Sequence, residues 1–181
     1  ILDTVGGAGI FVFGGKPDGS TFDAPLSRVL IHHNRVDRAL KIANDWGSIE
    51  TWQGGPHYLF NNLSSDPGGF WHWSYQANKA KPSYGTARQG YAYYLDGSFK
   101  NYLFNNIAWG ANNTLGDKRA NASAVQEIFS FQNNFANNTF YRFGNASRRQ
   151  RGEAGRNLWL GNVIEDISDW VWLNAGVRDR P

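Results

Sequence analysis

The segments Tyr58-Leu59-Phe60-Asn61-Asn62-Leu63 and Tyr102-Leu103-Phe104-Asn105-Asn106-Ile107 are almost the same six residues: an apolar triplet, two asparagines and another apolar residue. Three further segments, residues 29–36, 135–140 and 158–163, also place an asparagine after apolar residues. Aligning the five segments on one asparagine each gives separations of 28, 44, 32 and 24 residues, for Asn34, Asn62, Asn106, Asn138 and Asn162. Repetition in this range indicates a solenoid.

Each repeat is predicted to consist of strands. Apolar residues alternate or form short runs bounded by Gly, Asn and Asp, and no long i, i+3, i+4 stripe occurs. A second strand precedes the asparagine segment in four units, at residues 9–13, 48–52, 92–96 and 124–128. Asparagine readily adopts the left-handed conformation that a one-residue bend requires, and stacked amides can hydrogen-bond between coils. We therefore expect strand, turn, strand, asparagine bend and then a longer variable loop.

The composition indicates a folded chain stabilised by apolar burial. Of its 181 residues, 41% are hydrophobic, 15% are aromatic and none is cysteine. These values exclude intrinsic disorder, a disulfide framework, thiolate metal sites and a cysteine nucleophile. No window approaches the roughly 18 apolar residues of a membrane span, so we expect no membrane partner. The chain lacks Met and starts at Ile1, which leads us to expect part of a longer protein.

This layout resembles the right-handed parallel β-helix of the pectate-lyase-like superfamily. The resemblance implies an all-β fold of about six coils, with residues 1–181 forming a single segment of a longer β-helix. Residues 64–90 are expected to form a long, aromatic-rich loop insertion. Open sheet edges at the two ends would favour pairing with other strands, so we expect missing flanking segments or another chain to cap the stack.

Function is expected at outward positions that align between coils, because apolar side chains fill the interior. Glu50, Asp96 and Glu127 lie 12, 10 and 11 residues before the asparagine of their repeat. Alternation with their apolar neighbours predicts that all three point outward on one face. Neighbouring strands would hold such carboxylates roughly 5–10 Å apart, a range suited to glycoside hydrolysis, and like charges raise one another's pKa.

Two short segments resemble β-helix glycoside hydrolases of the fucosidase and xylanase type. Asp45-x-Gly47-x-Ile49 is similar to their Asp-x-Gly-x-Ile-Tyr segment, and residues 94–98 are similar to their Tyr-Leu-Asp-Asp-Gly-Ser segment. The resemblance implies that Asp45 and Asp96 are the catalytic pair. Glu50 stands in place of the usual Tyr and is therefore a third catalytic candidate, whereas a glycine replaces the second Asp of the other segment.

The same acids have two other interpretations. Asp45 and Asp96 both lie close before a glycine, which is ordinary turn chemistry. Clustered carboxylates also suit a structural or catalytic calcium ion, although the sequence requires no cofactor and defines no metal ligands.

Aromatic and donor side chains supply the candidate substrate-binding residues. Exposed tryptophan and tyrosine rings can stack on sugars, while histidine and arginine can donate hydrogen bonds to hydroxyl groups. The alternative is that the tryptophans of the 64–90 insertion cover the side of the coil and that His72 is only hydrogen-bonded. The candidates are Trp52, His57, Trp71, His72, Trp73, Arg88, Tyr94 and Glu127.

The net charge of +3 mildly favours a polyanionic partner. The one basic cluster of the chain is Arg148-Arg149-Gln150-Arg151, with Arg156 nearby. This cluster is either a solvated loop or a contact with an acidic ligand. No nucleic-acid-binding module surrounds it, so we expect no nucleic-acid partner.

Together these features predict a secreted or periplasmic enzyme that hydrolyses glycosidic bonds of a polysaccharide or oligosaccharide. One alternative is a polysaccharide lyase that cleaves a uronate polymer by β-elimination, and another is a non-catalytic glycan-binding β-helix. Elimination requires a base and a cation that neutralises the uronate, whereas the aligned outward positions are acidic. The acidic positions favour hydrolysis.

Overall fold

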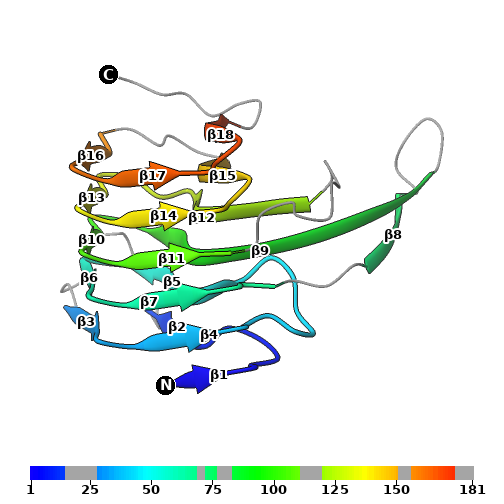
Figure 1. The fold of residues 1–181 in the computed structure, drawn as a ribbon, viewed down its shortest axis with the longest axis horizontal. Coiled ribbons are helices and arrows are strands. Elements are labelled where there is room, and N and C mark those ends of the chain that lie inside the picture. The colour runs from blue at the N-terminus through cyan, green and yellow to red at the C-terminus, as the bar shows by residue number, and fades with distance from the viewer. Residues whose placement is uncertain (15–27, 69–71, 77–82, 111–119, 151–155, 174–181) are drawn as a thin grey trace.

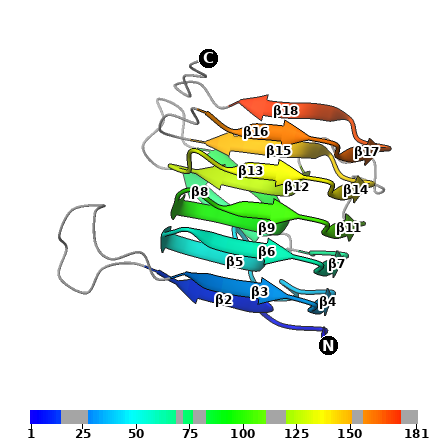
Figure 2. The same ribbon diagram turned by 90° about the vertical axis from the view of Figure 1, so that its left-hand side faces the viewer.

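The structure, a computed structural model, describes residues 1–14, 28–68, 72–76, 83–110, 120–150 and 156–173. Within these ranges the regular elements are all β-strands, and most of them stack into one column (Figures 1 and 2). This part of the chain contains no helix long and apolar enough to cross a membrane. The predicted all-β class is therefore confirmed.

Three parallel sheets form the sides of this solenoid-like stack. Sheet A contains β1 (Leu2–Asp3), β4 (Arg35–Asp37), β7 (Leu63–Ser65), β11 (Ile107–Trp109), β14 (Thr139–Tyr141) and β17 (Val163–Glu165). Sheet B contains β2 (Ile10–Phe13), β5 (Gly47–Gly54), β9 (Ser83–Ser98), β12 (Ala120–Ile128), β15 (Asn145–Gln150) and β18 (Asp169–Leu173). Sheet C contains β3 (Val29–His32), β6 (His57–Phe60), β10 (Tyr102–Phe104), β13 (Asn134–Ala136) and β16 (Leu158–Leu160).

The chain passes each sheet in turn, from B to C to A and back to B, as in β5, β6 and β7. Each coil therefore has three strands where the sequence predicted two. The additional strand is the three-residue strand of sheet A, which follows directly after the asparagine bend. Three residues are too few for the alternation of apolar residues to be visible in the sequence, so a loop was expected there. Each sheet remains open, with an edge strand at either end.

The predicted asparagine ladder is confirmed. The Oδ1 atom of Asn106 accepts hydrogen bonds from the backbone N–H and the Nδ2 of Asn62, at 3.0 and 3.1 Å. Asn106 in turn donates in the same way to Asn138, at 3.0 Å for both bonds. The pattern continues to Asn34 on one side and to Asn162 on the other. The ladder satisfies buried polar groups at the corner between sheets C and A.

The left-handed bend belongs to the residue before each ladder asparagine. Asn61 and Asn105 have φ angles of 54° and 55°, whereas the amides of Asn62 and Asn106 form the ladder. In the Asn-Asn pair, the first residue therefore forms the bend and the second forms the ladder, whereas the sequence pattern predicted both roles for one residue.

A second ladder lies at the corner between sheets B and C. The Nδ2 of Asn101 donates to Oδ1 of Asn133 at 2.8 Å, and the backbone N–H of Asn133 donates to Oδ1 of Asn157 at 2.8 Å. The sequence carried a signal for this ladder, because its asparagines immediately precede the strands of sheet C and repeat at separations of 32 and 24 residues, as in the first ladder.

The expected loop insertion at 64–90 contains regular structure. β8 (His72–Gln76) pairs antiparallel with the first part of β9, so that His72 lies opposite Ala87 and Gln76 opposite Ser83. This hairpin extends away from the stack (Figure 1). Its second strand continues without interruption into sheet B, which anchors the hairpin to that sheet.

Candidate functional site

The register of sheet B determines which side chains face outward. Ile49, Tyr93 and Val125 pair across three neighbouring strands and belong to the hydrophobic core. The next residues along the strands, Glu50 and Tyr94, pair with each other on the opposite face. Two positions further on, Trp52 and Asp96 pair on this same outer face. The outward orientation predicted for Glu50 and Asp96 is therefore confirmed.

Three carboxyl groups surround Tyr94 on the outer face of sheet B. Asp45 lies in the bend before β5, where its φ of 60° turns the chain, and its Oδ1 atom accepts a long hydrogen bond of 3.5 Å from the Tyr94 hydroxyl. Burial raises the pKa of Tyr94, and the charges of Asp45 and Asp96 raise it further. Tyr94 therefore remains a neutral donor among the acids, and the three predicted catalytic residues share one electrostatic environment.

Glu50 is the buried member of this group, with 5% of its surface exposed. Burial raises its pKa to about 8, although the Gly47 N–H donates to Oε2 at 3.1 Å and opposes this increase. The charges of Asp96 and Asp45 also raise the pKa. Glu50 is therefore a neutral acid near pH 7, as a general acid must be, and its local negative neighbours are the two other predicted catalytic residues.

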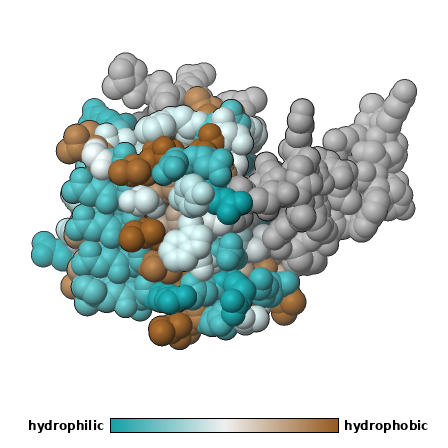
Figure 3. Space-filling view, in the orientation of Figure 1, coloured by the Kyte–Doolittle hydropathy of each residue, from teal (hydrophilic) through white to brown (hydrophobic). Residues whose placement is uncertain are grey.

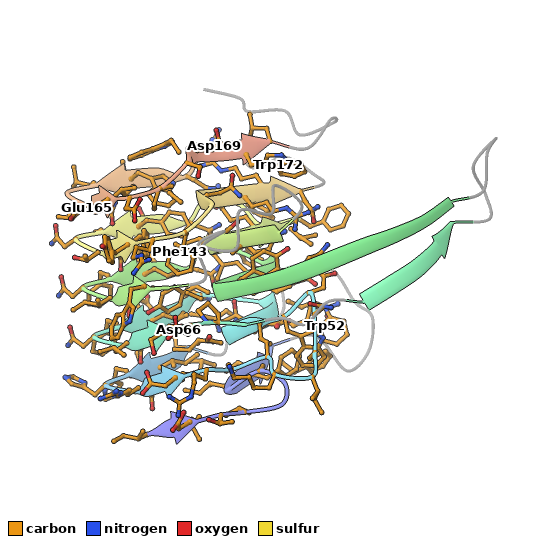
Figure 4. All side chains as sticks on the ribbon, turned by 45° about the vertical axis from the view of Figure 1, so that its right-hand side comes forward. Trp52, Asp66, Phe143, Glu165, Asp169 and Trp172 are labelled. Atoms are coloured by element: carbon orange, nitrogen blue, oxygen red, sulfur yellow. The ribbon has the colours of Figure 1, made fainter. Side chains whose placement is uncertain are left out.

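An aromatic cluster lies beside these acids. The Trp52 ring, which is 39% exposed, contacts Phe13 and Phe11 at centroid distances of 5.0 and 6.1 Å. Phe11 also contacts Trp46 at 5.3 Å. Figure 4 shows Trp52 on the side of the stack from which the β8–β9 hairpin extends. Because Trp52 pairs in register with Asp96, the exposed rings adjoin the carboxyl groups.

The opposite side of the molecule has a different surface. Figure 3, which views the strands of sheet A from outside, shows apolar side chains scattered among hydrophilic ones. The exposed apolar residues Ile107, Tyr141 and Val163 belong to different coils of that sheet. The combination of clustered acids and clustered aromatic rings described above belongs to sheet B.

Glu127 does not lie on the outer face, which corrects the sequence prediction. It pairs with Leu95, points into the coil and is 1% exposed. Its Oε1 atom accepts hydrogen bonds from Ser147 at 2.7 Å and from Arg149 at 3.2 Å. The reason is parity: Glu50 and Asp96 lie an even number of residues before their asparagine, and Glu127 an odd number, so alternation turns it inward.

His57 is also fully buried, in β6 of sheet C rather than in sheet B. Its Nε2 lies 3.2 Å from the carbonyl oxygen of Gln53, and burial lowers its pKa. The structure therefore places this candidate inside the coil, where it packs as a neutral side chain.

The remaining candidates belong to the insertion. Trp71 lies outside the described residues. His72 and Trp73 form part of β8, and Arg88 forms part of β9, but the positions of these three side chains lie outside the description. Of the eleven candidates, the structure thus brings Asp45, Glu50, Trp52, Tyr94 and Asp96 together.

Phe11, Phe13 and Trp46 of the aromatic cluster were not among the residues predicted from the sequence. Phe11 and Phe13 alternate with Ile10 and Val12, and this alternation marks two aromatic positions on one face of the strand.

No three Asp, Glu, His or Cys side chains in the described part of the chain are arranged so that they could hold a metal ion.

Comparison with known protein families, with curated proteins and with solved structures finds no match to this chain.

Proposed function

We propose that the chain is a glycoside hydrolase whose site is the outer face of sheet B. The observation that carries this proposal is the buried Glu50 carboxyl group, whose pKa burial raises to about 8, beside two further carboxyl groups and an exposed aromatic cluster. We further propose that the stack is a right-handed parallel β-helix of about six coils, similar to the pectate-lyase-like superfamily.

Glu50 is the general acid in this proposal, because its proton is available to the leaving oxygen of a glycosidic bond. Asp96 is the general base that activates water. The two residues lie on adjacent strands and are offset by two positions, so their Cα atoms are about 8 Å apart. This separation favours an inverting mechanism, in which the carboxyl groups are roughly 6.5–9.5 Å apart and water enters between them.

Asp45 and Tyr94 position and tune this pair. The negative charge of Asp45 helps to keep the proton on Glu50, and Tyr94 holds Asp45 through its hydroxyl group. Trp52 and its neighbouring rings provide apolar surfaces for the C–H faces of sugars, while the acids provide hydrogen-bond partners for hydroxyl groups. The proposed substrate is therefore a polysaccharide or an oligosaccharide.

The proposal is tested by incubating the chain with neutral and acidic glycans and measuring the release of reducing ends. Asp96→Asn and Glu50→Gln are each expected to lower kcat by about 100-fold or more. The matched control is Asp166→Asn, which removes an exposed carboxylate that pairs with Arg142 at 3.6 Å, and its activity is expected to match that of the parent chain.

Three results would contradict the proposed hydrolase. Near-normal activity of Asp96→Asn with an intact fold would remove Asp96 from the reaction. An unsaturated-uronate absorbance would identify elimination instead of hydrolysis. Glycan binding without turnover across the whole panel would identify a non-catalytic binding protein.

A further inference from the structure

Two consecutive buried arginines in β15 face opposite sides of sheet B. Arg149 pairs in register with Glu127, points into the coil and forms an ion pair with it at 3.2 Å. Arg148 pairs with Gln126, which in turn pairs with Tyr94, so Arg148 belongs to the same outward row as Glu50. Arg148 is nevertheless 4% exposed. From the sequence, this basic cluster is either a solvated loop or a contact with an acidic ligand. The structure places Arg148 and Arg149 in a strand and buries both, so they do not form a solvated loop.

Within the described residues, Arg148 forms no ion pair. Its Nη1 donates to the Tyr91 hydroxyl, and its guanidinium lies 4.8 Å from the centroid of the Trp172 ring and 5.7 Å from that of Tyr91. Its Nε is buried without a hydrogen-bond partner, as is the Oε1 atom of neighbouring Gln126. A desolvated cation whose donors are incompletely used is unfavourable unless an anion completes its environment.

Tyr91 connects Arg148 to the acids. Its ring packs edge-on against Tyr94 with a centroid distance of 5.3 Å. Arg148 lies on β15, two strands beyond Asp96 on β9, which corresponds to about 10 Å across the sheet. Figure 4 shows Trp172, whose ring lies against the guanidinium, on the same side of the stack as Trp52. Arg148 and the carboxyl groups therefore lie on one outer face of sheet B, within the span of an oligosaccharide.

We propose that Arg148 forms an anion-binding subsite that selects glycans carrying a carboxylate or a sulfate group. The planar guanidinium offers paired N–H donors that match either group, and the two flanking aromatic rings fix its orientation. The inference rests on the proposed function, because it assigns the substrate class of the same face: an acidic polysaccharide or oligosaccharide. Arg148 binds the charged group, and Glu50 and Asp96 act on the neighbouring glycosidic bond.

Binding by the Asp96→Asn chain, measured by isothermal titration calorimetry, tests the subsite without turnover. One pair of ligands is a uronate trisaccharide and its carboxyl-reduced neutral counterpart, and the other is a sulfated trisaccharide and its desulfated counterpart. We expect the charged member of at least one pair to bind more tightly. Adding Arg148→Gln is expected to lower the affinity for that charged ligand roughly 10- to 100-fold. The affinity for its neutral counterpart is expected to change less than about two-fold. The pair that responds identifies carboxylate or sulfate as the source of the charge.

Arg142→Gln is the matched control, because it removes one exposed positive charge that pairs with Asp166 at 3.6 Å. It is expected to leave all four affinities unchanged. Arg148→Lys retains the charge but not the planar fork, so it is expected to recover part of the lost affinity. It also provides a second test if circular dichroism shows that Arg148→Gln does not fold.

The outcomes separate this inference from the proposed hydrolase. Equal affinities within both ligand pairs, or equal losses of charged and neutral ligands in Arg148→Gln, would overturn the anion subsite. Hydrolysis of neutral glycans would then still support the proposed function. Conversely, charge-dependent binding that requires Arg148, in a parent chain that hydrolyses no glycan, would retain the subsite and refute the hydrolase.

Discussion

The pKa of Glu50 predicts a specific dependence of stability on pH. Folding raises this pKa from about 4.5 to about 8, so between these values the folded chain holds a proton that the unfolded chain has released. The free energy of unfolding therefore decreases as pH rises through this interval. In Glu50→Gln, the group that causes this decrease is absent. The stability of the variant relative to the parent chain should increase by about 3–4 kcal/mol between pH 5 and pH 8.

Urea unfolding at intervals between pH 5 and pH 8, followed by tryptophan fluorescence, measures this difference. Glu165→Gln removes an exposed carboxylate from sheet A and is expected to stay within about 0.5 kcal/mol of the parent at every pH. Asp96→Asn removes one of the charges that raise the Glu50 pKa, so it should reduce the total change in stability between pH 5 and pH 8. Burial is the larger cause of the raised pKa and should preserve most of this change. Parallel stability curves for Glu50→Gln and the parent would refute both the raised pKa and the assignment of Glu50 as the acid.

Two further predictions concern the interior. Asn106→Ala removes hydrogen bonds to Asn62, Asn138 and Leu59 and should destabilise the chain by about 3–5 kcal/mol in urea unfolding. Asn105→Gly changes a residue in the left-handed conformation, which glycine adopts readily, and should change stability by less than about 1 kcal/mol. Similar losses of stability in the two variants would contradict the separate roles of Asn106 in the ladder and Asn105 in the bend. Glu127→Gln should destabilise the chain by about 3–5 kcal/mol because it removes the carboxylate that pairs with the buried Arg149 guanidinium. A double-mutant cycle with Arg149→Gln should show coupling, which strict additivity would disprove.

The sequence was sufficient to predict the stacked strands because their determinants are local and repeated. The apolar triplet before Asn61 and Asn62 specifies a half-buried strand followed by a bend, and its recurrence before Asn105 and Asn106 requires the two copies to stack in register. The same local logic placed Glu50 and Asp96 outward. It failed for the strands of sheet A, which are too short to carry a pattern, and for the insertion, where β8 pairs with a strand that begins outside the stack.

The sequence by itself thus determined the repeating coil and the presence of acids on one face. The tertiary structure decided which charges are paired and which groups are desolvated. Asp45 joins Glu50 and Asp96 because Tyr94 of the next coil lies between them. Glu127 points into the coil because it lies one position along the strand from the outward-facing row. Likewise, Arg148 and Arg149 are chemically identical neighbours, yet a strand turns one toward Glu127 and the other toward Tyr91. Such differences arise from contacts between coils, and these depend on register and burial rather than on residue type.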